Sequence, residues 1–358
     1  MSRDVRRGQA GASGVSPLVT GSLGYAVTGV RRAATRAAPT VPDAVRSDGG
    51  AAPGFPDGRR SARPRTSLTA WREAGRFWTH RGHRIFTRVD GPENAPALLL
   101  IHGFPTASWD FEALWVPLCE RYRVFALDML GFGFSDKPPH HAYSISGQAD
   151  LQEAFLADHG IRTYGVLAHD YGDTVAQELL ARQAEPGERP TMNRLALLNG
   201  GLFPDSYRPL LTQRLLLSPL GPLVARLMTR STLARSFKKI FGASTQPDQE
   251  LIDAAWTLIT HNQGLTVVPR VIRYMAERKV KSERFVGALV RATIPLKLID
   301  GGADPISGRH MADRYRHIIP KPDVTVLEGI GHYPQCEAPE DVLRAFTAWA
   351  ADQGARPV

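Results

Sequence analysis

Short apolar segments alternate with segments of helical periodicity over most of the chain, and this alternation limits its possible folds more than any other feature. The apolar segments are continuous, as expected for strands that are buried on both faces of a sheet. Helices between such strands return the chain to the same edge, so most strands should run parallel. The predicted strands are His83–Val89, Ala97–Ile101, Tyr122–Leu127, Tyr164–Ala168, Leu195–Leu198, Leu296–Ile299 and Val324–Leu327.

The alternation is interrupted between residues 203 and 291, where the apolar spacing is helical and no strand is predicted. A helical insertion at this point would cover the carboxyl ends of the parallel strands, where such sheets bind ligands. We therefore predict a core of residues 67–202 and 292–358 with a helical cap of residues 203–291. Within the core, the main predicted helices are Trp109–Cys119, Ser146–His159 and Thr174–Arg182.

The N-terminal residues 1–66 are rich in Ala, Arg, Gly, Pro and Ser and show no periodicity. Because such a segment cannot bury enough apolar surface to offset its ordering entropy, we expect a disordered extension. Eleven arginines and four aspartates lie in residues 1–70, so this segment carries +7 of the net +9 charge. The remaining chain is nearly neutral and has no basic stripe with interleaved aromatics, so no nucleic-acid partner is expected.

Several features of the chain indicate a cytoplasmic protein without a membrane partner. No run of about 18 apolar residues is present. The weakly apolar stretch Leu18–Val30 is interrupted by glycines and lacks the continuous apolar region of an export signal. Cys119 and Cys336 are isolated, which is typical of a reducing compartment, and neither has a metal-ligand spacing. We expect no metal or cofactor, and a monomer or small homo-oligomer.

One predicted strand ends in Ala168-His-Asp170-Tyr-Gly172, and a helix follows at once. Small residues two positions before and after Asp170 permit a sharp strand-to-helix turn that exposes the central side chain. A turn of this kind normally presents a serine nucleophile, and here it presents a carboxylate. Asp170 as a simple helix cap is the alternative, because Asp is a favoured N-cap residue.

Two further turns complete a catalytic set in the chain order nucleophile, acid, histidine. Asp304 follows the strand Leu296–Ile299, and His332 follows the last predicted strand in a Gly-flanked loop. We predict that Asp304 holds one ring nitrogen of His332 and leaves the other nitrogen free to act as a base. Asp300 is a rival for the acid, but it lies at the strand end rather than in the turn.

The segment His102-Gly-Phe-Pro105 follows another strand, where it can contribute to an oxyanion hole. We predict that the backbone N–H groups of Phe104 and Tyr171 converge on one oxygen. His102 and His169 are expected to be structural members of their turns. Basic residues of the predicted cap are expected to lie on solvated helix faces; these are Lys238, Lys239, Arg278, Lys279 and Lys281.

An aspartate nucleophile restricts the substrate. Attack by a carboxylate on saturated carbon forms an ester, which a histidine-activated water can cleave, whereas a serine would form an ether. The substrate should therefore be an epoxide or carry a carbon–halogen bond. Tyr207 and Tyr274 lie in the predicted cap, and their phenols suit the protonation of an opening epoxide; packing is the alternative role for both.

Five blocks together resemble the epoxide hydrolase and haloalkane dehalogenase branch of the α/β-hydrolases, and within it the mesoderm-specific-transcript-like hydrolases. The blocks are His102-Gly-Phe-Pro-Thr-Ala-Ser108, Asp128-Met-Leu-Gly-Phe-Gly-Phe-Ser-Asp-Lys-Pro138, His169-Asp-Tyr-Gly-Asp173, Asn199-Gly-Gly-Leu-Phe-Pro204 and Gly331-His-Tyr-Pro-Gln335. The resemblance implies a mostly parallel eight-stranded sheet with helices on both faces and a helical cap after strand 6. It also implies Asp170 as nucleophile, Asp304 as orienting acid and His332 as base.

The chain departs from this branch beside the nucleophile, where Tyr171 stands in place of the usual tryptophan. Haloalkane dehalogenases often have asparagine where Phe104 stands, so epoxide hydrolysis is favoured over dehalogenation. A haloalkane dehalogenase and a non-catalytic ligand-binding member of the fold are the alternatives. The expected partners are a small hydrophobic substrate and water.

Overall fold

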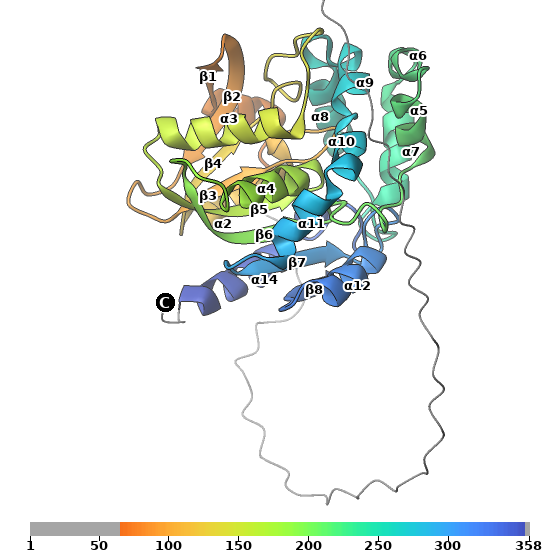
Figure 1. The fold of residues 1–358 in the computed structure, drawn as a ribbon. Helices are drawn as coiled ribbons and strands as arrows, with labels where there is room; N and C mark the ends of the chain where they lie inside the picture. The colour runs from red at the N-terminus through yellow and green to blue at the C-terminus, as the bar shows by residue number, and fades with distance from the viewer. Residues whose placement is uncertain (1–64, 355–358) are drawn as a thin grey trace, which may run out of the picture. The chain divides into compact units, whose positions relative to one another are not determined.

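The computed structural model describes residues 65–354 (Figure 1). The predicted disordered extension and the stretch Leu18–Val30 lie outside the described residues, apart from the last two residues of the extension. The described strands are β1 (Arg76–His80), β2 (His83–Asp90), β3 (Ala97–Ile101), β4 (Arg123–Leu127), β5 (Thr163–His169), β6 (Thr191–Leu198), β7 (Leu296–Gly301) and β8 (Val324–Leu327).

These eight strands form one sheet in the order β1-β2-β4-β3-β5-β6-β7-β8. β2 is antiparallel to both β1 and β4, and every other pairing is parallel. β5 lies near the middle and is buried along almost its whole length, as expected for a strand that is covered on both faces. The predicted fold class, a mostly parallel eight-stranded α/β-hydrolase sheet, is confirmed.

The strand β1 (Arg76–His80) was not predicted from the sequence. It forms a hairpin with β2 through Arg81 and Gly82, both of which have positive φ, as tight hairpin turns require. β1 is an edge strand that is mostly exposed, so its sequence contains no continuous apolar run. The periodicity that identifies a buried strand is therefore absent here.

Helices fill the connections between the strands. Those outside the segment between β6 and β7 are α1 (Leu68–Ala74), η1 (Ser108–Phe111), α2 (Glu112–Cys119), α3 (Ile145–Asp158), α4 (Tyr171–Arg182), α12 (Arg309–Ile318), α13 (Pro334–Glu337) and α14 (Pro339–Gly354). α3 packs against α4 in front of the strands in Figure 1, and α2 packs against α14. The three core helices predicted from the sequence lie within a few residues of η1–α2, α3 and α4.

The segment between β6 and β7 contains only helices among its described residues, so the predicted helical insertion is present. Its helices are α5 (Leu211–Leu217), α6 (Gly221–Arg226), α7 (Arg230–Ile240), α8 (Gln249–Thr260), η2 (His261–Thr266), α9 (Val268–Val271), α10 (Tyr274–Val280) and α11 (Ser282–Val290). The exact division into core and cap at residues 203 and 291 stays a prediction. None of the helices within residues 65–354 combines the length and apolar character needed to cross a membrane.

Candidate active site

Asp170 lies in the sharp turn between β5 and α4, with φ 49° and ψ −107°. Its backbone N–H donates to the carbonyl of Leu198 at 3.1 Å, which ties the turn to β6. The turn needs glycine at position 172, because a Cβ there would lie 2.1 Å from the carbonyl oxygen of Ile101. A non-glycine residue at positive φ is uncommon, and such strained backbone is concentrated at functional sites.

One carboxylate oxygen of Asp170 occupies the expected oxyanion position. The backbone N–H of Phe104 donates to Asp170 Oδ2 at 2.9 Å. Phe104 follows β3, which pairs in parallel with β5, so the two turns emerge at the same sheet edge. Tyr171 is the first residue of α4, where backbone N–H groups have no acceptor within the helix. The structure thus brings one predicted donor, the N–H of Phe104, onto the carboxylate, while the N–H of Tyr171 stays a predicted donor.

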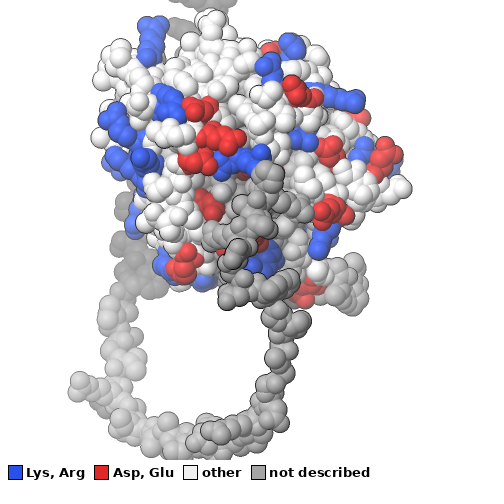
Figure 2. All heavy atoms as spheres, turned by 180° about the vertical axis from the view of Figure 1, so that it is seen from behind, with Lys and Arg blue, Asp and Glu red and all other residues white. Residues whose placement is uncertain are grey.

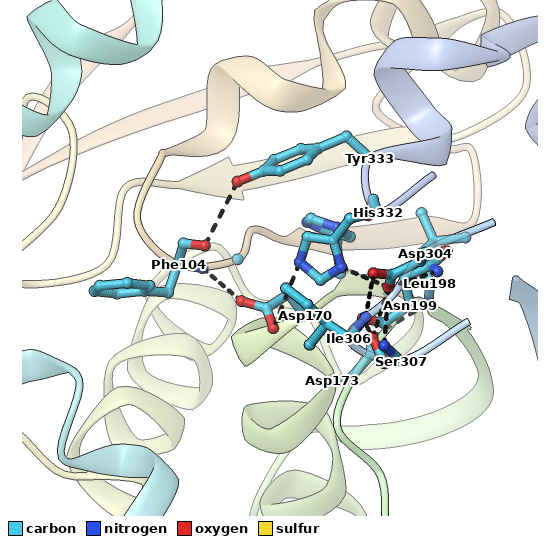
Figure 3. A network of polar contacts seen from close by, with 12 residues as sticks. Phe104, Asp170, Asp173, Leu198, Asn199, Asp304, Ile306, Ser307, His332 and Tyr333 are labelled. Atoms are coloured by element: carbon cyan, nitrogen blue, oxygen red, sulfur yellow. Dashed lines mark hydrogen bonds and ion pairs between the residues drawn. The ribbon is translucent and has the colours of Figure 1, made fainter. Parts of the chain in front are cut away.

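The other carboxylate oxygen faces the histidine. His332 Nε2 lies 3.9 Å from Asp170 Oδ1, and His332 Nδ1 lies 2.7 Å from Asp304 Oδ2. Figure 3 shows the ring between the two carboxylates. All three side chains are at least nine-tenths buried. This order places one ring nitrogen of His332 beside Asp170 and ties the other to Asp304, as the predicted roles of the three residues require.

Asp304 is held by a dense set of donors. The backbone N–H of Ile306 donates to Oδ1 at 2.8 Å, and the Ser307 hydroxyl and Asn199 amide donate to Oδ2 at 2.9 and 3.1 Å (Figure 3). Asn199 and Ser307 were missed by the sequence reasoning, although Asn199 opens one of the blocks that carry the resemblance. Both restrict the position of the carboxylate that orients His332.

Electrostatics favour a charged pair between His332 and Asp304. Burial alone would lower the pKa of His332, but the charge and hydrogen bond of Asp304, together with the charge of Asp170, raise it to about 9. Burial alone would raise the pKa of Asp304, and the charge and hydrogen bond of His332 outweigh it and lower that pKa. The negative charge of Asp170 therefore contributes to keeping a proton on the ring.

Asp300, the rival for the acid, lies within β7 and is fully buried. Neither of its carboxylate oxygens has a hydrogen-bond partner among the described residues. Burial raises its pKa well above the ordinary range, and the charge of Asp304 adds to this effect. The structure thus places Asp304, and not Asp300, against the ring of His332.

The other two buried histidines are held by hydrogen bonds to backbone groups, mostly of neighbouring turns. His102 Nε2 accepts a hydrogen bond from the backbone N–H of Met129 at 2.9 Å, and its Nδ1 lies 2.8 Å from the carbonyl of Gly103. His169 Nε2 donates to the carbonyl of His332 at 2.8 Å. Burial lowers the pKa of both rings, in His169 to about 3. These contacts match the structural role that the sequence indicates for them.

The two candidate activating tyrosines lie close to the nucleophile but do not line the pocket described below. Tyr274 stacks on Tyr171 with ring centroids 3.9 Å apart, and its buried hydroxyl has no hydrogen-bond partner among the described residues. Tyr207 donates to Gln213 Oε1 at 3.2 Å. Burial, with the charge of Asp170 acting in the same direction, raises the pKa of both phenols, so both are protonated donors.

The prediction that Arg278 lies on a solvated helix face is wrong. Its side chain is buried, with the guanidinium carbon 4.5 Å from the centroid of the Tyr207 ring and 5.5 Å from that of Tyr274. A Cβ at Gly201 would lie 2.4 Å from this guanidinium, so the glycine makes room for it. The pattern of charge along α10 could not show this, because Tyr207 and Gly201, which also surround the guanidinium, come from a distant part of the chain.

A pocket of about 110 Å³ reaches Phe104 and His332. Its apolar lining comes largely from α5, α6 and α7, and Tyr333 closes it beside His332. Apolar lining residues include Leu210, Leu216, Val224, Met228, Leu233 and Phe237. The pocket can hold a small apolar molecule next to His332, whose Nε2 lies 3.9 Å from Asp170 Oδ1. Within residues 65–354, no group of three or more His, Cys, Asp or Glu side chains is arranged to hold a metal ion.

The strand order of the sheet and the sharp turn at Asp170 are both typical of the α/β-hydrolase fold. The family model described as alpha/beta hydrolase fold matches residues 96–339, and the chain belongs to this family. The mesoderm-specific transcript homolog protein of Homo sapiens is 41% identical over 293 residues, which are 78% of this chain and 87% of that protein. The putative hydrolase LipZ of Mycobacterium tuberculosis is 36% identical over 80% of this chain and 99% of its own.

Solved structures with the same fold include an epoxide hydrolase and a haloalkane dehalogenase. The epoxide hydrolase CorEH aligns with a TM-score of 0.64 at 18% identity, over 78% of this chain and 99% of its own. A haloalkane dehalogenase DbeA variant from Bradyrhizobium elkanii aligns with a TM-score of 0.67 at 22% identity, over 78% of this chain and 97% of its own. The family and the relatives support a hydrolase, and the structural similarity supports the fold alone.

Proposed function

We propose that this chain hydrolyses epoxides through a covalent ester on Asp170. The observation that carries the proposal is that the two carboxylate oxygens of Asp170 have different neighbours. Oδ2 accepts a hydrogen bond from the Phe104 N–H, and Oδ1 faces His332. An attacking carboxylate oxygen and a separate oxyanion position are both needed for a two-step displacement. The apolar pocket that reaches Phe104 and His332, the two residues that contact or face this carboxylate, suits a small hydrophobic epoxide.

In the first step, Asp170 Oδ1 attacks an epoxide carbon and the carbon–oxygen bond of the ring breaks. The departing oxygen takes a proton from a phenol, for which Tyr274 and Tyr207 are the candidates. In the second step, a water gives one proton to His332 Nε2 and attacks Cγ of Asp170. The charge then develops on Oδ2, where the N–H groups of Phe104 and Tyr171 stabilise it.

Collapse of this intermediate breaks the bond between Cγ and Oδ1 and releases the diol, which takes the proton from His332. The second proton of the water remains on the regenerated carboxyl, which ionises and returns it to the ring of His332. Ester formation also removes the negative charge of Asp170, which is one of the causes of the raised pKa of His332. In the intermediate, the ring proton of the free enzyme can therefore pass to the phenolate formed in the first step, which leaves the neutral ring that the second step needs.

The direct test is incubation of the purified chain with styrene oxide and, separately, with 1-bromobutane. We expect diol from the first and no halide from the second. Halide release without diol would instead support the dehalogenase alternative, and no turnover of either by a protein with an intact fold would contradict the proposal for these substrates. A single turnover in oxygen-18 water should leave the label on Asp170 and not in the diol.

His332→Gln should trap the ester, because the first step does not use His332 as a base. We expect intact mass spectrometry to show an adduct equal in mass to the epoxide, and peptide mapping to place it on Asp170. The matched control is His332→Gln combined with Asp170→Asn, which should show no adduct. An adduct on the control protein, or none on His332→Gln with an epoxide that the wild type turns over, would contradict the ester mechanism.

A further inference from the structure

Five leucines on and beside α5 and α6 are exposed to solvent, although leucine is usually buried. Their side chains are between 39% and 71% exposed. We call this set the leucine face; it consists of Leu211, Leu215, Leu220, Leu223 and Leu227. Scattered exposed apolar residues are ordinary, but a grouped set marks an interaction surface.

The spacing of these leucines gathers them on one side of each helix. Leu211 and Leu215 are four residues apart on α5, and Leu223 and Leu227 are four residues apart on and just after α6. Residues at this spacing are neighbours on a helix surface. α5 and α6 pack against each other, so the two pairs belong to adjoining helices.

The same part of the chain is strongly basic. Residues 206–247 contain seven Arg and Lys residues and no Asp or Glu. Of these seven, Arg230 has an ion-pair partner, Asp253, and the other six have none within residues 65–354. Arg208, Arg214 and Arg226 are exposed and stand close in sequence to the leucines. In Figure 2, the edge that carries α5–α7 in Figure 1 lies on the left and shows Lys and Arg side chains among uncharged atoms.

The leucine face is the outer side of the helices that line the pocket. Thr212, Gln213 and Leu216 of α5 and Val224 of α6 line the pocket that reaches His332. The outward leucines of α5 and α6 alternate with these pocket-lining residues. An apolar molecule held against the outer side would therefore lie one helix layer from the pocket.

We propose that the leucine face docks onto the surface of a membrane that contains anionic lipids. Leucines that enter the acyl boundary, with arginines beside them at the headgroups, are the combination by which interfacial helices bind such membranes. A second copy of the chain fits less well, because a symmetric contact would bring the unpaired arginines of both copies together. Leucine is also uncommon among the residues that dominate protein–protein interfaces. Docking at a membrane surface needs no membrane-spanning helix. The absence of a long apolar run in the sequence therefore does not argue against it.

Vesicle co-sedimentation of the full chain tests the proposal, with vesicles of phosphatidylcholine alone and of phosphatidylcholine with phosphatidylglycerol. We expect binding to the anionic vesicles that weakens with salt. The variants Leu223→Ser/Leu227→Ser and Leu211→Ser/Leu215→Ser should each bind about tenfold more weakly, because each loses two apolar side chains from the contact. The control Val116→Ser/Val280→Ser removes two valines that are 52% and 85% exposed elsewhere, and it should bind as the wild type does.

The arginine-rich residues 1–66 are present in every one of these proteins, so any binding that they provide is common to all and cancels from the comparison. Equal vesicle binding by the leucine variants and the wild type, with folding checked by circular dichroism, would overturn the proposal. So would a dimer in analytical ultracentrifugation that Leu223→Ser/Leu227→Ser dissociates, because the face would then be an interface between copies. Binding needs no turnover, so Asp170→Asn should bind vesicles normally whether or not the proposed reaction is correct.

Discussion

At the residue scale, the charge of Asp170 affects the protonation of His332. The Asp170 carboxylate lies 3.9 Å from His332 Nε2, and its charge is among the causes that raise the pKa of the ring to about 9. The same charge is absent in the proposed ester. The charged carboxylate of Asp170 therefore favours a protonated His332 ring in the free enzyme. Its conversion to the proposed ester favours the neutral ring, which can act as a base.

The variant Asp170→Asn imitates the ester and should lower the pKa of His332. We expect the ring to titrate near pH 9 in the wild type and at a lower pH in the variant, because the hydrogen bond to Asp304 remains and only one negative charge is lost. NMR titration of isotopically labelled histidine measures both values. His80 and His141, whose pKa values burial lowers and among whose perturbing charges Asp170 does not appear, provide internal references in the same spectra. An unchanged His332 pKa would contradict the coupling.

The two tyrosines can be separated by single substitutions to phenylalanine. Tyr274 has a buried hydroxyl without a partner, whereas the Tyr207 hydroxyl donates to Gln213. We expect Tyr274→Phe to lower kcat for an epoxide by about 10²-fold, as loss of a general acid does, and Tyr207→Phe to have a smaller effect. Arg278 lies beside both rings and its charge favours phenolate, so it can ease the loss of either proton. Full activity of Tyr274→Phe would make its assigned role wrong.

At the element scale, the turn between β5 and α4 depends on how closely two parallel strands approach. A Cβ on Gly172 would lie 2.1 Å from the carbonyl oxygen of Ile101, and this oxygen belongs to the backbone of the neighbouring strand β3. The strand cannot move aside without breaking its pairing with β5. The position of Asp170 is therefore set by sheet packing as well as by the local turn.

Gly172→Ala should lower the free energy of unfolding by about 3 kcal/mol or more and should abolish turnover. The added Cβ would overlap the backbone of Ile101, and only a displacement of the backbone could remove this overlap. The matched control is Gly147→Ala on α3, where a Cβ would meet only the side-chain oxygen of Ser144, at 3.1 Å. We expect a change within about 1 kcal/mol for this control. Urea unfolding curves and an epoxide assay measure both. Equal stability of the two variants would contradict the packing argument.

At the scale of the whole molecule, buried carboxyl groups connect stability to pH. Burial raises the pKa of Asp110 to about 8, and its carboxyl accepts a hydrogen bond from the Thr106 hydroxyl. The unfolded chain releases this proton near the ordinary value of 3.8, while the folded molecule keeps it until about pH 8. Between these pH values, unfolding releases a proton, so a rise in pH favours the unfolded state.

Asp110→Asn should remove this part of the pH dependence, because the amide cannot ionise and its oxygen can still accept from Thr106. We expect the free energy of unfolding of the wild type, relative to the variant, to fall by a few kcal/mol as the pH rises from about 4 to about 8. Chemical unfolding across this range measures the difference. A constant difference would show that Asp110 ionises normally in the folded protein.

Much of the fold and of the candidate site can be predicted from the sequence, because the features that indicate them are local. Continuous apolar runs identify the strands that are buried on both faces, and small residues around Asp170, Asp304 and His332 mark the turns that end three of them. The chain order of these turns predicts the fold class, which the structure confirms. It also predicts which side chains meet, and the structure brings Asp170, His332, Asp304 and the N–H of Phe104 together; their catalytic roles stay a prediction.

Only the tertiary structure decided the features that depend on contacts between distant segments. The edge strand β1 lacks the apolar run of a buried strand, and its existence follows from pairing with β2. The support of Asp304 by Asn199 and the burial of Arg278 against Tyr207 both join residues from separate elements. A single sequence shows what each segment prefers, but the burial and charge of a side chain are set by neighbours that only the folded chain brings to it.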